Sequence, residues 1–391
     1  MQQPDSSELP LVSVCTPTFN RRPFIKTMFE CFKNQDYPMD RIEWIIVDDG
    51  TDKIVDLITS SNIRQIRYFQ VDNKMTLGSK RNYMHTHVRG SIIVYMDDDD
   101  YYPPERISHA VDTLLKNPEA MCAGSSEIYL YFKGMTKMIQ AGPYGENHAT
   151  AGTFAFRTTL LNETKYNEDA ALAEEREFLK GYTVPFVQLN PLKSILVFSH
   201  NHNTYDKRKM FKTANPQFFK ESDKTVEMFI RKPTEQNIFK FFMEDIDELL
   251  EQYEPGLPTM KPDVLDQIKK IESERDEMIQ KHNEAQQQLN KPIMFTQPGK
   301  EPIQLSSQEV VDMILNLQNV NQLLTKQVQE INKPIMVTQP GKEPVQLSNQ
   351  EVVNLISNLQ NVNQLLTKRV QELTNKINEL TSTSIPDTTE E

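Results

Sequence analysis

The chain has few cysteines, few glycines, no long apolar run and less positive than negative charge. Its 391 residues include three cysteines, an odd number spaced too widely for a disulfide framework or a zinc site. No apolar run reaches the roughly 18 residues of a transmembrane helix, so we expect no membrane span. The formal net charge of −12 argues against nucleic-acid binding, which requires a basic surface.

Two further features indicate a cytoplasmic protein. The opening residues, MQQPDSSELP, lack the basic and apolar regions of a signal peptide. Two of the three cysteines, Cys15, Cys31 and Cys122, fall in apolar stretches, where we expect buried thiols in a reducing compartment. A hydrophobic content of 38% is enough for a globular core in part of the chain, but low for a core throughout.

From Leu11 to about His200, apolar runs alternate with helical patterns. The pattern predicts strands over 11–19, 42–50, 63–71 and 91–96, and helices over 22–35, 78–88 and 103–117. Such alternation is typical of an α/β fold with a Rossmann-like, mostly parallel sheet and helices on both faces. Ligands bind such sheets at the carboxyl ends of the strands, where this chain has the polar segments 16–20, 48–50 and 97–100.

The rest of the chain reads as a helical region followed by an internal repeat. Asn290–Ile331 is followed directly by a near copy, Asn332–Leu373. Each copy has a proline- and glycine-rich half that cannot be helical, and then a helix opened by a capping box, Ser306 to Glu309 or Ser348 to Glu351. We therefore divide the chain into a domain over 1–210, a helical extension over 211–289, repeats over 290–331 and 332–373, and a polar tail over 374–391.

Apolar residues recur with heptad spacing in both repeat helices. They are Val310, Leu317, Leu324 and Ile331 in the first copy, and Val352, Leu359, Leu366, Leu373 and Leu380 in the second. This spacing favours a coiled-coil-like seam, through which we expect the protein to form a homo-oligomer. A loosely ordered, glutamine-rich tail is the alternative.

Four consecutive aspartates, Asp97 to Asp100, follow the apolar run SIIVYM. Adjacent carboxylates repel one another, so such a run is found on solvated loops or around a cation. Here the run directly follows a predicted buried strand and precedes YYPPER, which would fix the loop and start a helix. This context favours a site for Mg²⁺ or Mn²⁺, which prefer oxygen ligands and often share them with phosphates.

Other polar residues suit a phosphate-bearing ligand. Lys80 and Arg81, in GSKRN, stand at a predicted helix start, where the helix dipole favours anions. Alone they would be surface charges, but beside a metal they would clamp a diphosphate. In VDDGT, Asp48 or Asp49 could accept hydrogen bonds from the N–H edge of a flat ring, although Asp-Asp-Gly is also ordinary turn chemistry.

Four motifs, LVSVCTPTFNR, IEWIIVDDGT, GSKRN and SIIVYMDDDD, resemble family 2 nucleotide-sugar glycosyltransferases of the GT-A fold in order and spacing. The resemblance covers about Leu11 to Tyr205 and extends to compact soluble members, including those of large DNA viruses. A viral protein of this kind would act in the host cytoplasm. The resemblance implies a UDP-sugar donor, Mn²⁺ or Mg²⁺ as cofactor, a hydroxyl of a glycan or other small molecule as acceptor, and inversion at the anomeric carbon.

The resemblance also implies roles for single residues. The nucleotide would be bordered by Pro17, Thr18, Asn20 and Arg21. Asp48 or Asp49 would contact the base, and Arg81, with Lys80, the diphosphate. The family's Asp-x-Asp signature falls on Asp97, Asp98 and Asp99: the first would meet the ribose and the last the metal, with Asp100 assisting.

An inverting transfer needs a general base, which takes the proton of the acceptor hydroxyl. In the family this base is the second carboxylate of a Glu-Asp pair before a helix, and here LAEEREFL offers Glu175, with Glu174 as second choice. Glutamate in place of aspartate reaches one carbon further. An exposed helix start rich in acids would look the same.

A histidine after a late strand ligates the metal in many members of the family. His200 follows the run SILVFS, and His202 would lie on the same face by strand alternation; we prefer His200. The following DKRK would be a lid over the diphosphate or a solvated turn. We expect the acceptor near Glu174 and the segment 141–156, with wall candidates Tyr144, His148 and Phe154.

Two other functions compete with this one. A nucleotidyltransferase also pairs strand-end aspartates with a metal, but it would need a glycine-rich phosphate loop after the first strand, which TPTFNRRP does not provide. The second alternative is an inactive nucleotide-sugar-binding head on an oligomerising, scaffolding coiled-coil tail.

Overall fold

A computed structural model describes residues 8–170, 175–203, 207–209, 211, 215–289, 293–295, 301, 303–305, 307–329, 335–338, 341, 343 and 345–382. Their contacts divide the chain into one compact unit that ends at Ile271 and a second that begins at Glu272. None of the helices in these described segments has the length and hydrophobicity of a membrane span. Cys15, Cys31 and Cys122 are buried free thiols, as the sequence predicted.

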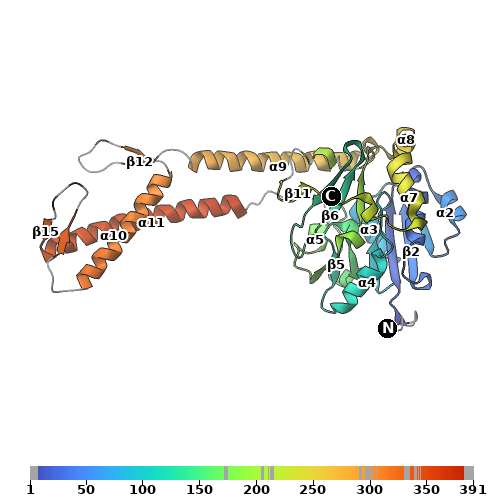
Figure 1. Ribbon diagram of the computed structural model, residues 1–391, viewed down its shortest axis with the longest axis horizontal. Coiled ribbons are helices and arrows are strands. Elements are labelled where there is room, and N and C mark those ends of the chain that lie inside the picture. The colour runs from blue at the N-terminus through green and yellow to red at the C-terminus, as the bar shows by residue number, and fades with distance from the viewer. Residues whose placement is uncertain are drawn as a thin grey trace. The chain divides into compact units, whose positions relative to one another are not determined.

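A mixed β-sheet forms the centre of the first unit (Figure 1). Its strand order is β3-β2-β1-β4-β8-β5-β9. The bounds are β1 Val12–Thr18, β2 Ile42–Asp48, β3 Ile66–Gln70, β4 Ile92–Tyr95, β5 Cys122–Gly124, β8 Ala155–Arg157 and β9 Phe186–Gln188. The first four strands pair in parallel, whereas β8 runs antiparallel to β4 and β5. The predicted α/β sheet is therefore confirmed, with one reversed strand that makes it mixed.

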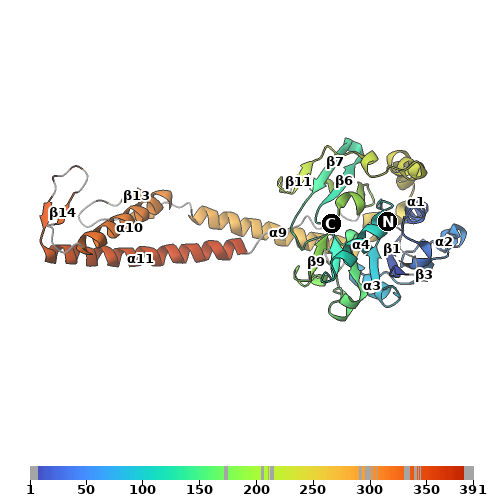
Figure 2. The same cartoon turned by 60° about the horizontal axis from the view of Figure 1, so that its bottom comes forward.

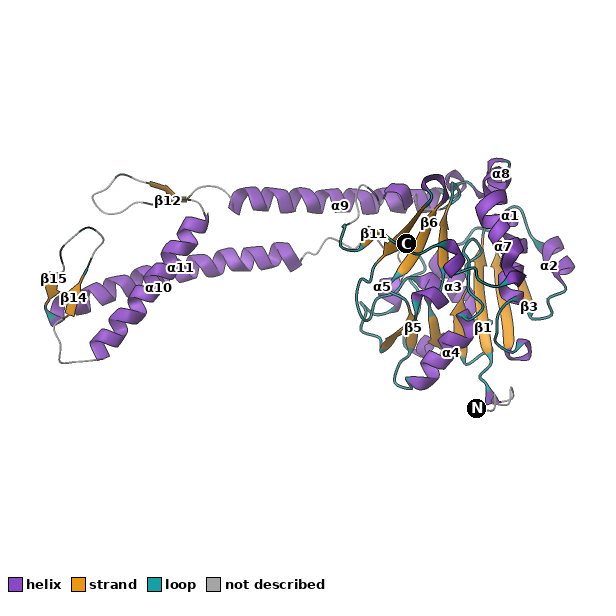
Figure 3. Ribbon diagram, in the orientation of Figure 1, coloured by secondary structure: helices purple, strands orange, loops and turns teal. Residues whose placement is uncertain are grey.

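Helices cover both faces of this sheet, because alternate residues of each central strand point to opposite sides. On one face, Trp44 of β2 belongs to a buried cluster that also contains residues of α1 (Arg22–Lys33) and α4 (Arg106–Lys116). Phe32 of α1 stacks on the Trp44 ring, with 4.1 Å between ring centroids. On the other face, Tyr95 of β4 packs with Met84 of α3 (Leu77–His85). The short helix α2 (Val55–Ser61) connects β2 to β3 (Figure 3).

A second sheet, with strand order β10-β6-β7-β11, joins the aspartate run to the late part of the unit. The bounds are β6 Ile128–Phe132, β7 Lys137–Ala141, β10 Leu196–Ser199 and β11 Phe219–Glu221. Tyr101, just after the aspartates, forms a bridge with Leu196 of β10: their backbone N–H groups donate to each other's carbonyls at 3.0 and 2.9 Å. The strand that precedes His200 therefore lies beside the aspartate run.

The residues after the second sheet also pack into the first unit. α7 (Gln236–Lys240) continues through a π-helical turn over Phe241–Asp245 into α8 (Ile246–Glu251). The Phe242 ring stacks on Phe198 of β10 with 4.1 Å between centroids. The long helix α9 (Pro262–Leu289) begins in this unit, and α5 (Glu175–Phe178) is a single turn. Much of the predicted helical extension therefore packs with the 1–210 segment.

In the second unit each sequence repeat forms a β-hairpin and then a helix (Figure 2). The hairpins are β12 (Ile293–Phe295) with β13 (Ile303–Leu305), and β14 (Ile335–Val337) with β15 (Val345–Leu347). The helices are α10 (Ser307–Gln329) and α11 (Asn349–Ser382), which contact each other. The sequence predicted the helices and excluded helix in the proline-rich halves, but it did not predict the hairpins.

The details of the repeat helices agree in part with the sequence patterns. Ser348 and Glu351 form the predicted capping box: Glu351 N–H donates to Ser348 Oγ at 3.4 Å, and Ser348 N–H donates to Glu351 Oε2 at 2.9 Å. Ser306 and Ile331, of the first copy, lie outside the described residues. Leu324 and Val352 are buried, consistent with a packed seam. A coiled coil between chains stays a prediction.

Candidate functional site

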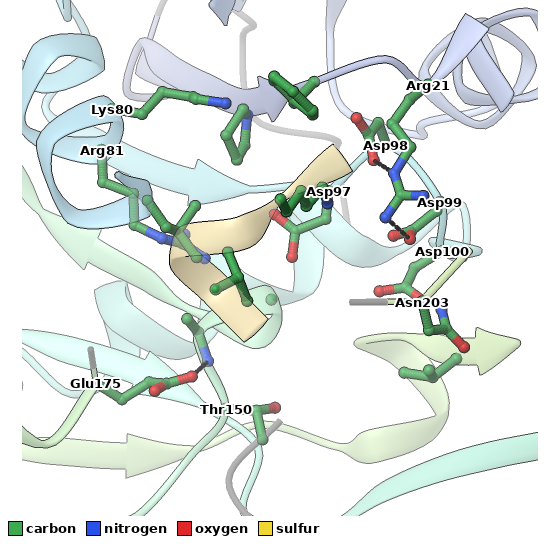
Figure 4. A pocket seen from close by; sticks show the side chains of 18 of the residues that line it. Arg21, Lys80, Arg81, Asp97, Asp98, Asp99, Asp100, Thr150, Glu175 and Asn203 are labelled. Carbon is green, nitrogen blue, oxygen red and sulfur yellow. Dashed lines mark hydrogen bonds and ion pairs between the residues drawn. The ribbon is translucent and has the colours of Figure 1, made fainter. Parts of the chain in front are cut away.

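A pocket of about 240 Å³ lies at the carboxyl ends of β1 and β4 (Figure 4). Its lining includes the four aspartates Asp97 to Asp100 and, across from them, Glu175. The cationic side chains in the lining are Arg21, Lys74, Lys80, Arg81, Lys207 and Lys261. The pocket thus combines a cluster of carboxylates with several ammonium and guanidinium groups.

The start of the aspartate run is held in place by the buried side chain of Tyr102. The N–H of Asp97 donates to Tyr102 Oη at 2.8 Å, and the Tyr102 hydroxyl donates to the carbonyl of Gly152 at 3.1 Å. A Cβ atom on Gly152 would lie 3.1 Å from Asp97 Oδ2, so a side chain there would crowd the carboxylate. Asp98 is only 7% exposed. The run is therefore a fixed wall of the pocket and not a solvated loop.

Arg21 and His200 are the nearest charge partners of the run. Arg21 Nη2 lies 3.2 Å from Asp99 Oδ2, and its Nε lies 3.7 Å from Asp98 Oδ1. His200 Nε2 lies 3.4 Å from Asp99 Oδ2. Burial raises the pKa of the Asp99 carboxyl, but Arg21 and His200 outweigh it and hold this pKa below its ordinary value. Burial and the neighbouring Asp99 charge raise the pKa of Asp98 to about 7.

The same residues are chemically suited to a divalent cation. Asp99 and His200 bring an oxygen and an imidazole nitrogen together, although no group of three or more metal-binding side chains is assembled within the described residues. Mg²⁺ and Mn²⁺ keep several waters and share substrate phosphates, so one or two protein ligands are sufficient. Burial and the Asp99 charge also raise the pKa of Asp100. A cation would relieve this repulsion among the carboxylates, so the residues fit the metal.

The two histidines after β10 have different surroundings, because the strand ends at Ser199 and the chain turns. His200 faces Asp99, and burial lowers the pKa of its imidazole to about 4. His202 instead approaches the carbonyl oxygen of Tyr253, with Nε2 at 2.7 Å. Strand alternation therefore does not apply to this pair.

Arg81 and Lys80 come from the first half of α3. The N-cap Thr76 accepts a hydrogen bond from Ser79 N–H, and Gly78 packs closely on the 167–170 segment. Arg81 is buried, lines the pocket and stacks over the Tyr95 ring, 4.3 Å from its centroid. Lys80 forms a buried ion pair with Asp49 and donates to the carbonyl of Thr18 at 3.2 Å.

The residues predicted to border the nucleotide fall into two groups. Pro17, Arg21, Lys80, Arg81, Asp97 and Asp98 line the pocket, whereas Thr18, Asn20, Asp48 and Asp49 are not part of its lining. Asp48 holds the turn after β2, since its carboxylate accepts from Gly50 N–H at 2.9 Å, Ile54 N–H at 3.1 Å and the Tyr68 hydroxyl at 2.6 Å.

Asn20 connects two loops behind the pocket. It has a left-handed backbone with φ of 52°, a conformation that asparagine tolerates better than most residues. Its Oδ1 accepts from Asp52 N–H at 2.9 Å, and its Nδ2 donates to the carbonyl of Pro255, also at 2.9 Å. The Asn20 amide therefore uses both of its polar atoms to connect the loops at Asp52 and Pro255.

Glu175 is the first residue of α5 and is 3% exposed. Its Oε1 accepts a hydrogen bond from the N–H of Ala151 at 2.8 Å, which orients the carboxylate beside the pocket. Glu174, the second candidate for the base, lies outside the described residues.

The proposed acceptor wall differs from its prediction. Phe154 is fully buried, and its ring packs near that of Phe178 with 6.2 Å between centroids, so it belongs to the core. Tyr144 and His148 contact each other, with ring centroids 4.9 Å apart, and do not line the pocket. From this loop it is Thr150, Ala151 and Gly152 that line it.

Several lining residues were not singled out from the sequence: Phe19, Lys74, Met75, Leu77, Asn203, Asp263 and Val264, together with Lys261. Phe19 could have been found, since it stands between the site candidates Thr18 and Asn20. Lys207 belongs to DKRK, which the sequence left open between a lid and a solvated turn. No sequence pattern around Lys261 indicates a site residue. Burial, with the charge of Arg21, lowers the pKa of its ammonium group to about 7.

Known proteins resemble the part of the chain that builds this pocket. Poly(ribitol-phosphate) beta-N-acetylglucosaminyltransferase TarS of Staphylococcus aureus is 26% identical over 184 residues, which are 44% of this chain and 32% of TarS. Putative glycosyltransferase EpsH of Bacillus subtilis is 33% identical over 100 residues, 25% of this chain and 28% of EpsH. This chain therefore spans about a third of the length of these curated relatives.

Solved structures with similar chain paths include S. aureus TarS in complex with UDP-GlcNAc, with a TM-score of 0.38, 21% identity, and coverage of 48% of this chain and 58% of that one. Another is the mannosyltransferase PcManGT of Pyrobaculum calidifontis in complex with GDP-Man and Mn²⁺, with a TM-score of 0.42, 16% identity, and coverage of 61% and 72%. Residues 13–165 match the family described as Glycosyl transferase family 2. The segment that contributes β1 to β4 and the aspartate run is therefore a glycosyl transferase family 2 domain.

Proposed function

We propose that the protein is a metal-dependent, inverting glycosyltransferase that moves a sugar from a UDP-sugar to a hydroxyl of a glycan or other small acceptor. The observation that carries this proposal is the pocket itself. In it a fixed aspartate run, the buried cation Arg81 and the buried carboxylate Glu175 converge, within or beside a family 2 domain. Buried groups of opposite charge in a concave site are typical of catalysis on charged substrates.

The donor would lie between the aspartate run and α3. Asp99 and His200, with Asp100 assisting, would hold Mn²⁺ or Mg²⁺, and Asp97 and Asp98 would meet the nucleoside. When bound, the metal would neutralise charge on the leaving diphosphate. Arg81 would contact the same diphosphate, while the Lys80–Asp49 pair would fix the loop beside it.

Glu175 would act on the acceptor. Its carboxylate would take the proton of the acceptor hydroxyl as that oxygen forms a bond to the anomeric carbon of the sugar. The bond from this carbon to the diphosphate oxygen would break on the opposite side, and the electron pair would leave with UDP. The hydrogen bond from Ala151 N–H supports the role, because it orients one carboxylate oxygen and restrains the rotamer.

The first test is binding and turnover by the full chain. Calorimetric titration with UDP should show binding that depends on Mn²⁺, and a panel of nucleotide sugars should contain at least one donor that is hydrolysed. UDP-GlcNAc is the first donor to try, because the name of the relative TarS specifies N-acetylglucosaminyl transfer. Metal-dependent UDP binding without turnover of any donor would instead favour an inactive nucleotide-sugar-binding head.

A further inference from the structure

The pocket has an outer wall that comes from outside the family-matched segment. We define the strap as residues 253–271, which comprise two short helical turns and the beginning of α9. Lys261, Asp263 and Val264 of the strap line the pocket, and the pale orange start of α9 crosses it in Figure 4. The pocket has a volume of about 240 Å³. This is smaller than the volume of typical small-molecule pockets, which begins at roughly 300 Å³. The strap is therefore close enough to touch a bound donor.

The strap is attached to loops on both sides of the pocket. Near its beginning, the Tyr253 hydroxyl donates to Asp52 Oδ2 at 2.9 Å. A Cβ atom on Gly256 would lie 2.7 Å from the carbonyl oxygen of Asn20, so the backbones are in close contact. Further along, Lys74 Nζ donates to Asp263 Oδ1 at 2.6 Å, and Gln267 Nε2 donates to the carbonyl of Asp169 at 2.7 Å. These attachments give Lys261 a defined position.

Three ammonium groups surround one aromatic ring at this wall. The Nζ atoms of Lys74, Lys80 and Lys261 lie 5.4, 5.8 and 5.8 Å from the centroid of the Phe19 ring. Lys74 and Lys80 also form ion pairs, with Asp263 and Asp49 respectively. Ammonium groups gathered around one ring repel one another. The arrangement favours an anion at the mouth of the pocket.

The electrostatic partners of Lys261 locate that anion. Lys261 interacts with Asp98 and Asp99, with Arg21, which pairs with both of these aspartates, and with Lys80. Lys261 therefore lies close to the carboxylates that would hold the metal, in the same pocket lining as Arg81, which would contact the diphosphate. A metal bound at Asp99 would neutralise part of the negative charge that faces Lys261. A phosphate group bound next to the metal would then supply a new negatively charged partner for the Lys261 ammonium group.

We propose that Lys261 is a binding residue for the phosphates of the donor nucleotide, presented by the strap. The inference rests on the proposed function, since it assumes that a nucleoside diphosphate occupies this pocket. It adds a residue that lies about a hundred positions beyond the end of the family match at 165. It also gives the strap a function: the strap closes the donor site with a cation.

The test compares two ligands that differ only in the diphosphate. UDP and uridine are titrated by calorimetry into the full-length protein with Mn²⁺ present, for wild type, Lys261→Met and Lys261→Arg. We expect Lys261→Met to weaken UDP binding about tenfold or more, as for the loss of one charged hydrogen bond, and to leave uridine binding within about twofold. Lys261→Arg should restore most of the UDP affinity, because it retains the positive charge.

A matched control and a stability measurement keep the result interpretable. Lys269→Met removes an ammonium group from the same helix, where the side chain is 75% exposed, and should leave UDP affinity unchanged. Thermal melting of each variant checks the fold, and Lys261→Gln serves as the neutral variant if Lys261→Met melts early. The inference is overturned if neutral variants bind UDP like wild type, or if they lose UDP and uridine affinity equally. If wild type itself binds no nucleoside diphosphate, the proposed function fails and the inference fails with it.

Discussion

The most informative single residue for the proposed chemistry is Glu175. Replacing it with glutamine keeps its size and the hydrogen bond from Ala151 N–H but removes the basic oxygen. We expect Glu175→Gln to bind UDP and Mn²⁺ like wild type and to lose sugar transfer by about 10²- to 10⁴-fold. The measurement is initial transfer rate at saturating donor.

The control for this variant lies on the same helical turn. Glu177 is exposed, so Glu177→Gln should transfer sugar at the wild-type rate. Normal transfer by Glu175→Gln would disprove the base assignment, and Glu174 would then be the next candidate to substitute.

Asp99 tests the metal site separately from the base. Asp99→Asn keeps the shape of the side chain but removes the charge that faces Arg21 and His200. We expect wild-type protein to melt at a higher temperature when Mn²⁺ and UDP are added together, because a ligand that binds only the folded state stabilises it. Asp99→Asn should lose most of this shift. An equal shift in the variant would show that the metal binds elsewhere.

Single site residues were predicted best from the sequence where a chemically informative residue type stands at the end of a predicted strand. The acids after SIIVYM were placed at the end of a strand, and β4 does end at Tyr95, just before them. Asp48 was ambiguous from sequence, because Asp-Asp-Gly suits both a ligand contact and a turn, and its carboxylate accepts three hydrogen bonds that hold the turn. Lys261 could not be predicted, because its contacts depend on how a distant segment folds back.

Among the elements, α3 depends on a glycine to reach its position. A Cβ atom on Gly78 would lie 1.9 Å from the carbonyl oxygen of Asn167, so α3 would have to move away. We expect Gly78→Ala to lower the free energy of unfolding by about 1–3 kcal/mol, as for overpacked sites, and to weaken UDP binding because Lys80 and Arg81 move with the helix. Chemical denaturation and calorimetry measure the two effects.

A second glycine provides the control for this substitution. A Cβ atom on Gly134 would have no heavy atom within 4 Å, so Gly134→Ala should change neither stability nor UDP binding appreciably. If Gly78→Ala is as stable as wild type and binds UDP normally, the close packing of α3 on the 167–170 segment is not required for the site.

The approximate bounds of β1 to β4 and of α1, α3 and α4 followed from the sequence, because strands buried on both faces and amphipathic helices have different periods. β5, β8 and β9 of the first sheet, the second sheet and the repeat hairpins were not predicted. β11 and the hairpin strands are three residues each, too short for a reliable alternation pattern. Their pairing depends on contacts between segments and not on local propensity.

At the scale of the whole molecule, the repeats are the predicted site of self-association. Leu323 and Leu365 occupy equivalent positions in the two copies and are 61% and 71% exposed. If these side chains contribute to an interface between chains, wild type should be oligomeric by light scattering. The double variant Leu323→Glu/Leu365→Glu should then have a smaller mass without loss of helical circular dichroism. Wild type of monomer mass would contradict the predicted homo-oligomer.

The central claim is that the pocket at the carboxyl ends of β1 and β4 is the donor site of a metal-dependent glycosyltransferase. The most direct measurement is a crystal structure of the full chain grown with Mn²⁺ and UDP. We expect a cation against Asp99 and His200 and a diphosphate between that cation and Arg81, with Lys261 in contact with the diphosphate. Nucleotide bound elsewhere on the molecule, with no cation at the aspartate run, would show that this pocket is not the donor site.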